Sequence, residues 1–450
     1  MKVVMIGGGG ASIVCANTLR IMGSKANIDM YTRRDRTGYT PCEQPFFLRK
    51  VMNHEDMFYA GNDWFVKKGI RLHLNTEVES IDKKNKTILA NSKSVSYDIL
   101  VINTGASPVA PDIQGLDGNH EYYLTSELSG IRKLEEIIAK SKKAAILGSG
   151  IIGVEMAETL IGLGYKEIYL IASSPHILSQ FLDADMSKTI EPILTQHGIK
   201  LRLATTIERI ESKNQSKIIK LQNGGILKVD FILIAKGVRP NVELAERSGL
   251  VIGEAGGIEV NSFLQTSDPN IYAIGDCMEG WNPIEGKKEI TALATHANRT
   301  GRIAARNIHF GNRSPFYGSM GALGGEIFGS TICRVGYTET KALKMGEEVI
   351  SITREGLLRR KMFGGEKLDI KLIVNKNKQT LIGAQLIGPR EVNRIAERIV
   401  LMIGEQLPLS RISQYETIFS PPLSTAYDIV TMGIDIIIRK LIAENITLTS

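Results

Sequence analysis

Cys42 is the residue whose type and surroundings point most clearly to chemistry. It lies in the segment Tyr39–Phe47, which reads YTPCEQPFF and holds two prolines and an aromatic pair. Cysteine reacts as a thiolate, so Cys42 is a candidate for thiol chemistry, with a buried structural thiol as the alternative. The other three cysteines are predicted to pack in the core: Cys15, Cys277 and Cys333. None of the four forms a CxxC pair and no histidine spacing suits a metal, so we expect no metal site.

Two glycine turns are candidates for phosphate binding. Each follows a short apolar strand and opens a helix: Gly7–Ser12 after Val3–Ile6, and Gly148–Gly153 after Ala144–Leu147. A second strand is predicted after each helix, at Asn27–Tyr31 and Glu167–Ile171. Glycine lets the backbone approach a pyrophosphate, which then lies at a helix N-terminus where free N–H groups favour anions. This repeated order predicts two dinucleotide-binding units.

The two turns differ in their third position. The residues predicted to bind a cofactor in the second turn are Gly148, Gly150, Ile151 and Gly153. Those in the first turn are Gly7, Gly9, Gly10 and Ser12. Serine replaces the third glycine there, and its small side chain still permits close packing of helix and strand.

Both units lack the acidic residue that usually binds the adenosine ribose. Thr32, followed by Arg33, stands at that position in the first unit, and Ala172 stands there in the second. A carboxylate at this position hydrogen-bonds the ribose hydroxyls and repels a 2′-phosphate. Because Ala172 is followed by Ser173 and Ser174, the second unit is predicted to accept NADPH, and the preference between NADPH and NADH stays open.

The length, pattern and charge of the rest of the chain limit the classes of function that are possible. The 450 residues are too many for one core, so two or three domains are expected. Beyond Gly311 the pattern changes to strands at Thr331–Gly336, Ile370–Val374 and Leu381–Leu386, then helices at Glu391–Met402 and from Ser424 onward. A net charge of +7 with scattered basic residues does not predict nucleic-acid binding. The apolar run Ile429–Ile438 is too short for a membrane span, and we expect a cytoplasmic protein without a membrane partner.

Four further segments make the chain resemble the FAD-dependent pyridine nucleotide-disulfide oxidoreductases. They are Val101–Pro108, Gly237–Asn241, Thr266–Asp276 and Lys371–Pro389. The resemblance assigns cofactor roles to Thr104, Gly105, Ala106, Gly237 and Asp276, and Asp276 would hold the flavin ribitol. It implies an α/β fold with two Rossmann-like dinucleotide-binding domains and a C-terminal α+β dimerisation domain. The expected ranges are 1–112 with 242–315 for FAD, 113–241 for NAD(P), and 316–450 for dimerisation.

Within this family the Cys42 segment is similar to the motif of the single-cysteine branch, the coenzyme A-disulfide reductases and NADH oxidases. Ala297–Arg302 and Ser420–Ser424 also match that branch. The resemblance implies a homodimer in which NAD(P)H reduces FAD and FAD reduces Cys42. The substrate would be a low-molecular-weight disulfide, persulfide or polysulfide, with coenzyme A disulfide favoured. The candidate substrate-binding residues are Arg20, His296, Asn298 and Arg302. A solvated charge is the alternative for Arg20, and a surface or packing role is the alternative for His296.

Three departures from the branch keep alternatives open. Glu43 replaces the glycine after the cysteine, and a carboxylate there would raise the pKa of the thiol unless it points away or pairs with a base. Phe419 replaces a tyrosine that donates protons, for which Tyr415 or Tyr427 could substitute. Gly10 stands where NADH oxidases carry a histidine, which favours thiol chemistry over oxygen reduction. The alternatives are an NAD(P)H oxidase and a degenerate FAD-binding electron-relay subunit of a larger complex. No rhodanese domain is expected after Ser450.

Overall fold

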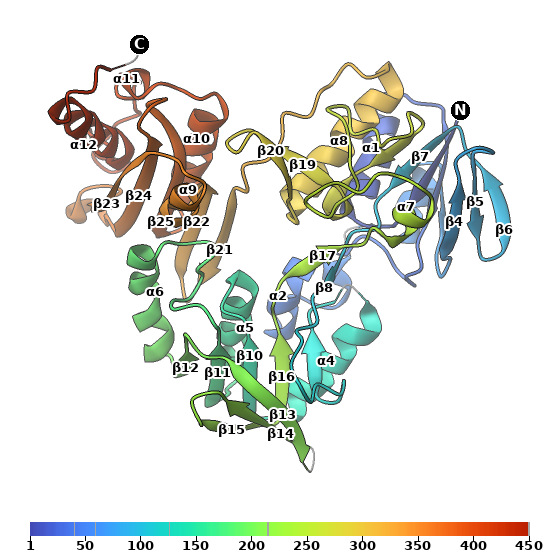
Figure 1. The fold of residues 1–450 in the computed structure, drawn as a ribbon, viewed down its shortest axis with the longest axis horizontal. Helices are drawn as coiled ribbons and strands as arrows, with labels where there is room; N and C mark the ends of the chain where they lie inside the picture. The colour runs from blue at the N-terminus through green and yellow to red at the C-terminus, as the bar shows by residue number, and fades with distance from the viewer. Residues whose placement is uncertain (40, 59, 126, 214–215, 449–450) are drawn as a thin grey trace. The chain divides into compact units, whose positions relative to one another are not determined.

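The computed structural model describes residues 1–39, 41–58, 60–125, 127–213 and 216–448, and it divides into two compact units (Figure 1). Unit 1 holds residues 1–141 and 233–319, and unit 2 holds residues 142–232 and those from 320 onward. Unit 1 contains the first glycine turn and Cys42. Unit 2 contains the second glycine turn and the C-terminal sheet. The three predicted domain ranges stay a prediction.

A parallel sheet forms the core of unit 1. Its strand order is β18-β7-β1-β2-β3, with β1 in the centre. The strands are β1 (Lys2–Ile6), β2 (Asn27–Tyr31), β3 (Ile70–His73), β7 (Ile99–Ile102) and β18 (Ile271–Ala273). Val3, Val4 and Met5 of β1 are fully buried, as expected for a parallel strand covered on both faces. Two helices, α1 (Gly10–Ile21) and α8 (Ala294–Phe310), pack against each other within this unit.

Shorter elements complete unit 1. The helices are η1 (Pro41–Glu43), α2 (Gln44–Leu48), η2 (Glu55–Met57), α3 (Asn62–Lys67), α4 (Leu128–Lys140), α7 (Glu243–Arg247) and η3 (Gly275–Cys277). The strands are β4 (Val78–Asp82), β5 (Thr87–Ala90), β6 (Lys93–Ser96), β8 (Ala106–Pro108), β9 (Glu121–Tyr123), β17 (Val238–Pro240), β19 (Glu279–Asn282) and β20 (Lys287–Ile290). β4, β5 and β6 form an antiparallel sheet, and β8 pairs with β17.

Unit 2 begins with a second sheet in which β12, β11, β10 and β16 are neighbours in that order. The strands are β10 (Lys143–Leu147), β11 (Glu167–Ile171), β12 (Ile199–Arg202) and β16 (Phe231–Ile234), and the division between the units falls within β16, after Ile232. Helices α5 (Ile151–Gly162) and α6 (Ala184–Gln196) connect the three parallel strands. A separate antiparallel sheet follows, made of β13 (Ile207–Lys213), β14 (Ser216–Leu221) and β15 (Ile226–Val229).

The C-terminal part of unit 2 is an antiparallel sheet in the order β21-β22-β25-β24-β23 (Figure 1). The strands are β21 (Leu323–Ile327), β22 (Ser330–Gly336), β23 (Val349–Leu357), β24 (Lys367–Asn375) and β25 (Thr380–Gly388). The helices are α9 (Glu339–Lys344), η4 (Lys361–Phe363), α10 (Val392–Gly404), α11 (Leu409–Ile412) and α12 (Ile429–Ala443). α10 packs on β22 and β25, whereas α12 packs on β23 and β24.

The predicted fold class is confirmed, with one helix boundary wrong. Both strand–turn–helix–strand units form, and β2 and β11 have the predicted bounds. The last helix does not start at Ser424 but at Ile429. Asp428 is its N-cap, because its carboxylate accepts hydrogen bonds from the backbone N–H of Val430 at 3.0 Å and of Thr431 at 3.5 Å.

Candidate active site

The first glycine turn joins β1 to α1 and is held by the end of β7. Gly7 has a φ of +105°, and a Cβ added there would lie 1.9 Å from the backbone oxygen of Asn103. The Asn103 side chain donates a hydrogen bond of 2.9 Å to the hydroxyl of Ser12, which is fully buried. Ser12 therefore does more than leave room for close packing, because it ties the first turn of α1 to β7.

This turn leaves the N-terminus of α1 open to an anion. Gly9 is the N-cap and Gly10 is the first helical residue. In the described part of the chain no side chain caps the helix at Gly9, so its first backbone N–H groups are available. The turn thus has the geometry that the prediction of a pyrophosphate site requires.

Asp276 lies in η3, beside the α1–α8 pair. The N–H of Gly275 donates to the Thr300 hydroxyl at 3.0 Å, and a Cβ on Gly301 would lie 2.4 Å from the backbone oxygen of Ala11. Burial raises the pKa of Asp276 to about 6. Asp276 is half-buried, and sugar-alcohol hydroxyls would supply hydrogen bonds to a carboxyl group that is partly withdrawn from water. Asp276 and the first turn therefore fit FAD, with Asp276 as the group that would hold its ribitol.

The two segments that resemble the family's interdomain crossovers are bonded to each other. Asn241 donates from its side chain to the backbone oxygen of Thr104 at 2.9 Å and from its backbone to Gly105 at 2.9 Å. The Thr104 hydroxyl donates to the backbone oxygen of Asn241 at 2.6 Å. Ala106 pairs with Pro240 in the β8–β17 ladder, which follows Gly237. The predicted cofactor residues Thr104, Gly105 and Ala106 are thus held by the return crossover.

The predicted adenosine end of the FAD site has no carboxylate at its usual position. Thr32 is buried, and its hydroxyl accepts a hydrogen bond of 3.3 Å from the N–H of Arg34. Arg33 points to solvent and forms an ion pair of 3.5 Å with Glu127. Thr32 therefore stabilises the local loop, and any contact it makes to a ribose would be through the same hydroxyl.

The second glycine turn reproduces the first within unit 2. A Cβ on Gly153 would lie 2.0 Å from the backbone oxygen of Gly148, which itself has a φ of +118°. Gly150 is the N-cap of α5, Ile151 is the first helical residue, and a Cβ on Gly150 would meet no described atom within 4 Å. Gly153 is thus required by packing, whereas the space at Gly150 is open to a ligand.

Hydroxyl groups replace the ribose acid beside this second turn. Ala172 is buried at the end of β11. The hydroxyls of Ser149 and Ser174 lie 3.3 Å apart, and the Ser174 hydroxyl donates to the backbone oxygen of His176 at 3.0 Å. Hydroxyl groups do not repel a 2′-phosphate as a carboxylate would, which keeps the prediction that NADPH is accepted.

Cys42 lies in η1, directly ahead of α2, and its side chain is exposed. Cys15, Cys277 and Cys333 are buried. Burial raises the pKa of Cys15 to about 12 and that of Cys333 to about 11, so these thiols are poor nucleophiles near neutral pH. Among the four cysteines, the structure leaves Cys42 best placed to react with a solute.

Three polar side chains around Cys42 were not predicted as site residues. Gln44 is buried, and its amide group donates a hydrogen bond to the backbone oxygen of Thr125. Glu43 Oε2 and Gln44 Oε1 are buried and lack a hydrogen-bond partner within the described ranges. Tyr39 is buried, and this burial raises the pKa of its phenol in spite of the opposing hydrogen bond with Gln44. Their position between the cysteine and Pro45 is the signal in the sequence that could have identified Glu43 and Gln44.

The burial of Glu43 affects how strongly its carboxyl group can repel a thiolate at Cys42. It raises the pKa of the Glu43 carboxyl group, which favours its neutral form over that of an exposed glutamate. The carboxyl group is therefore a weaker source of repulsion for a thiolate at Cys42 than its position in the sequence implied.

We expect Glu43→Gln to raise the rate at which iodoacetamide alkylates Cys42 at pH 7 by roughly two- to tenfold. The substitution removes a group that can carry negative charge beside the sulfur and so favours the thiolate. Alkylation rates between pH 6 and pH 9, with Cys42 reduced beforehand, measure this. Glu55→Gln is the control, because Glu55 is exposed and pairs with Arg36 at 3.0 Å. An unchanged or slower rate in Glu43→Gln would show that the carboxyl group does not influence the sulfur.

The candidate substrate-binding residues differ in their surroundings. Arg20 donates three hydrogen bonds to backbone oxygens, those of Lys68 at 2.7 Å, Ser24 at 2.9 Å and Gly69 at 2.9 Å. These contacts join the end of α1 to the end of α3, so Arg20 has a structural role and is not simply a solvated charge.

The other three candidates lie on α8. Asn298 and Arg302 are exposed and four residues apart, which places them on one side of the helix. His296 is buried, and both of its ring nitrogens lack a partner in the part of the chain that the structure describes. Burial lowers the pKa of His296 to about 4, so its imidazole is neutral near pH 7. Its edge-on contact with Phe316 is typical of a packing role.

The C-terminal segment that resembles the branch's active-site loop is exposed in unit 2. Phe419 and Tyr415 are exposed. The Tyr427 hydroxyl donates to the carboxylate of Asp435, which raises the pKa of the phenol. Of the two tyrosines that could replace the missing proton donor, Tyr427 is therefore already engaged.

Neither a metal-binding cluster nor a membrane-spanning helix is found in the described ranges of the chain. No group of three or more His, Cys, Asp or Glu side chains is arranged there to hold a metal ion. None of the helices in those ranges combines the length and apolar character needed to cross a bilayer.

Comparison with known proteins agrees with this geometry. The family model for pyridine nucleotide-disulphide oxidoreductases matches residues 1–301, and the model for their dimerisation domain matches residues 327–428. An NADH oxidase of Methanocaldococcus jannaschii is 31% identical, covering 98% of this chain and 99% of its own. An NAD(P)H coenzyme A polysulfide/persulfide reductase of Pyrococcus horikoshii is 31% identical, covering 90% of this chain and 91% of its own.

A solved structure is similar along nearly the whole chain. The NAD-dependent persulfide reductase from A. fulgidus has a TM-score of 0.94 and 29% identity, covering 98% of this chain and 84% of that one. The matched dimerisation domain supports a homodimer. The chain belongs to the pyridine nucleotide-disulphide oxidoreductase family, and it is an NAD(P)H-dependent oxidoreductase with FAD as its cofactor.

Proposed function

We propose that this protein passes electrons from NAD(P)H through FAD to Cys42, which reduces a low-molecular-weight disulfide, persulfide or polysulfide. Coenzyme A disulfide is the favoured substrate. The observation that carries the proposal is the exposed thiol of Cys42 in η1, in a chain whose other three cysteines are buried. The name of the Pyrococcus horikoshii relative, a coenzyme A polysulfide/persulfide reductase, supports the choice of substrate.

The chemistry at Cys42 is thiol–disulfide exchange. The Cys42 thiolate attacks one sulfur of the disulfide, a new S–S bond forms, and the other half leaves as a thiolate that takes up a proton. Two electrons then cleave the mixed disulfide, which releases the second thiolate and regenerates Cys42. FAD, when bound, supplies the two-electron relay between the nicotinamide and this sulfur. The turn at Gly148–Gly153 would hold the nucleotide, and the turn at Gly7–Ser12 with Asp276 would hold FAD.

A second candidate is an NAD(P)H oxidase that reduces oxygen, because the Methanocaldococcus jannaschii relative is named an NADH oxidase. Gly10 argues against it, since glycine brings no acid–base group to the start of α1. A positioned acid–base group typically contributes about 10²–10⁴-fold to a rate. We therefore expect oxygen reduction to be slower than reduction of the disulfide.

We also propose that the protein is a homodimer and that it acts in the cytoplasm. Its substrate would contain coenzyme A. The absence of CxxC pairs and of a disulfide framework supports a reducing compartment. The candidates for substrate binding stay Arg20, His296, Asn298 and Arg302. Asn298 and Arg302 are the two exposed candidates on α8, whereas Arg20 also donates hydrogen bonds to three backbone oxygens.

The purified yellow protein, mixed anaerobically with NADPH and coenzyme A disulfide, is expected to oxidise NADPH in sustained turnover. NADH is run in parallel, and we expect NADPH to be accepted because Ala172 leaves no carboxylate to repel its 2′-phosphate. Nicotinamide absorbance is the measurement. Bleaching of the flavin without turnover would move the search to persulfides, oxygen or a protein acceptor. A protein that neither nucleotide bleaches would instead support an electron-relay subunit, and strong preference for NADH would overturn the nucleotide prediction.

A further inference from the structure

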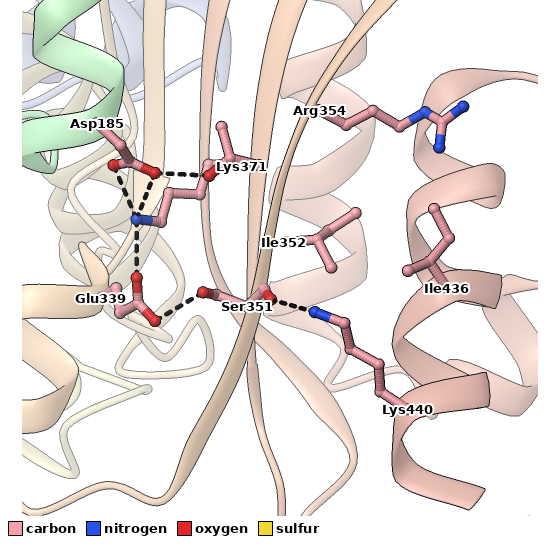
Figure 2. A pocket seen from close by; sticks show the side chains of 9 residues that line it. Asp185, Glu339, Ser351, Ile352, Arg354, Lys371, Ile436 and Lys440 are labelled. Atoms are coloured by element: carbon pink, nitrogen blue, oxygen red, sulfur yellow. Dashed lines mark hydrogen bonds and ion pairs between the residues drawn. The ribbon is translucent and has the colours of Figure 1, made fainter. Parts of the chain in front are cut away.

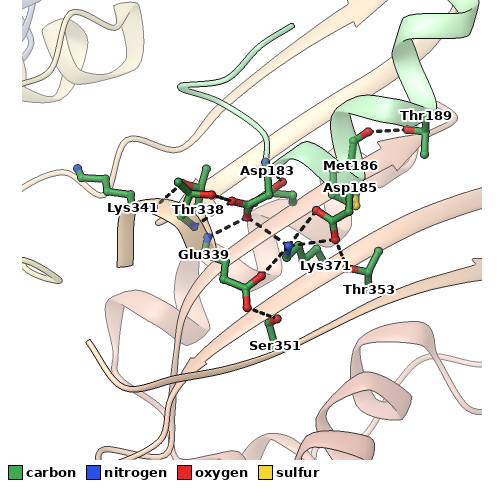
Figure 3. Close-up of polar contacts among 12 residues, drawn as sticks. Asp183, Asp185, Met186, Thr189, Thr338, Glu339, Lys341, Ser351, Thr353 and Lys371 are labelled. Atoms are coloured by element: carbon green, nitrogen blue, oxygen red, sulfur yellow. Dashed lines mark hydrogen bonds and ion pairs between the residues drawn. The ribbon is translucent and has the colours of Figure 1, made fainter. Parts of the chain in front are cut away.

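A buried lysine connects two parts of unit 2. Lys371 of β24 is almost fully buried, and its ammonium group meets the carboxylates of Glu339 at 2.8 Å, Asp185 at 2.9 Å and Asp183 at 3.5 Å. Figure 3 shows the three carboxylates converging on it. Asp183 and Asp185 lie at the start of α6, whereas Glu339 begins α9. The lysine therefore joins the nucleotide-binding fold to the C-terminal sheet.

Asp183 is the most strongly held member of this cluster. Its carboxylate accepts hydrogen bonds from the backbone N–H of Glu339 at 2.8 Å, from the hydroxyl of Thr340 at 2.6 Å and from the amide of Gln385 at 2.6 Å. Its own N–H donates to Gln385 at 2.8 Å. Burial alone would raise the pKa of Asp183, but the hydrogen bonds and Lys371 outweigh it and hold that pKa below its usual value. Asp183 is thus kept ionised and fixed in position.

The segment 177–183 carries this attachment to the second glycine turn. The N–H of Leu178 donates to the backbone oxygen of Ser149, in the middle of the turn, at 2.7 Å. Leu178 is fully buried and has a φ of +54°, which is uncommon for a residue other than glycine. Such a backbone persists only when its surroundings hold it. The C-terminal sheet holds this segment at Asp183, five residues later, and also at Gln180, whose backbone oxygen accepts a hydrogen bond of 3.0 Å from Arg334 of β22.

The same sheet also contacts the turn directly. A Cβ on Gly325 of β21 would lie 2.7 Å from Ile151 Cδ1 and 3.2 Å from Glu155 Oε1. Ile151 is the first residue of α5. The C-terminal sheet therefore meets the second glycine turn directly at Gly325, and it also holds the segment 177–183 that contacts the turn, through Asp183 and Arg334.

We propose that Lys371 is a positioning residue for the nicotinamide nucleotide, which it acts on by fixing Asp183 and with it the segment that supports the Gly148–Gly153 turn. This inference rests on the proposed assignment of that turn as the nucleotide site. The inference goes further than that assignment, because it means that residues of the C-terminal sheet influence the affinity for the nucleotide without contacting it.

The surroundings of Lys371 make a variant feasible. A cavity of about 330 Å³ lies beside it, lined by Asp185, Glu339, Arg354 and Lys440 among others (Figure 2). In Figure 2 Arg354 extends toward the helix that carries Lys440. The cavity gives water access to the Asp185 and Glu339 carboxylates. Water could therefore solvate these two of the three carboxylates once the ammonium group is removed.

Lys371→Met in the holoenzyme is expected to weaken the binding of NADP⁺ about tenfold, measured by calorimetry with the oxidised protein. Hydrogen exchange at the Leu178 amide is expected to speed up by a similar factor, and a lysine that acts only in the C-terminal sheet would not cause this. FAD content and visible spectrum should stay unchanged. Lys371→Arg keeps the charge and should lose less affinity. Lys376→Met is the control, because Lys376 forms a separate ion pair with Glu444 at 2.8 Å.

A folded Lys371→Met variant with parental affinity and parental exchange at Leu178 would overturn the inference. If Lys371→Met does not fold, Thr340→Ala provides the test instead. Thr340 is exposed, and the substitution removes only its side-chain hydrogen bond to Asp183. We expect about threefold weaker binding of NADP⁺ there, and unchanged binding would overturn the inference. Neither readout uses a disulfide, so a failure of the proposed function would appear separately, as a parental protein that binds nucleotide but does not turn over coenzyme A disulfide.

Discussion

Cys42→Ser is expected to lower turnover of coenzyme A disulfide by about a thousandfold or more while the protein stays folded and yellow. A serine hydroxyl cannot form the exchangeable bond to sulfur on which thiol–disulfide exchange depends. Because Cys42 is exposed, we expect the change in free energy of unfolding to stay within about 0.5 kcal/mol. Anaerobic oxidation of NADPH measures turnover, and bleaching of the flavin by NADPH should persist because it does not need the thiol.

Cys333→Ser is the matched control for this experiment. Cys333 lies buried in β22, and burial raises its pKa to about 11, so it makes a poor nucleophile. Its replacement should leave turnover per folded molecule unchanged. Turnover that survives in Cys42→Ser would remove Cys42 from the mechanism and favour direct electron transfer to another acceptor such as oxygen.

The sequence predicted those features that depend on local pattern. Asn27–Tyr31 and Glu167–Ile171 form strands with the predicted bounds, because each is a short run between a helix and a polar turn. The predicted cores around Cys15, Cys277 and Cys333 are also confirmed by burial. The predicted start of the last helix was wrong because Asp428, four residues after Ser424, caps the helix with its side chain.

Contacts between distant residues were not predictable in the same way. The sequence around Arg20 does not predict that the backbone oxygens of Lys68 and Gly69 accept its hydrogen bonds. The role of Asn103 in holding Ser12 appears only when the end of β7 comes beside α1. Lys371 was read as part of a strand, yet its partner Asp185 lies 186 residues earlier in the chain. Such long-range pairs follow from the packing of whole elements, which local periodicity does not specify.

Gly150→Ala is expected to weaken the binding of NADP⁺ by roughly tenfold to a hundredfold without lowering the melting temperature. Gly150 has a φ of −71°, which suits alanine, and an added Cβ meets no described atom within 4 Å. Alanine also reduces the conformational freedom of the unfolded chain. The methyl group would instead occupy the space through which a pyrophosphate approaches the helix N-terminus. Calorimetry with the oxidised holoenzyme measures affinity, and the visible spectrum reports on the FAD site that we propose in unit 1.

Gly153→Ala is the matched comparison for Gly150→Ala, because we expect it to lower stability directly. Its Cβ would lie 2.0 Å from the backbone oxygen of Gly148, a clash within the protein itself. We expect a loss of roughly 3 kcal/mol or more in the free energy of unfolding of unit 2. A stable Gly150→Ala protein with parental affinity would mean that the nucleotide does not approach this turn. Weaker binding at unchanged stability would separate a ligand contact from a packing contact, because the two glycines lie three residues apart in the same turn and only one of them faces open space.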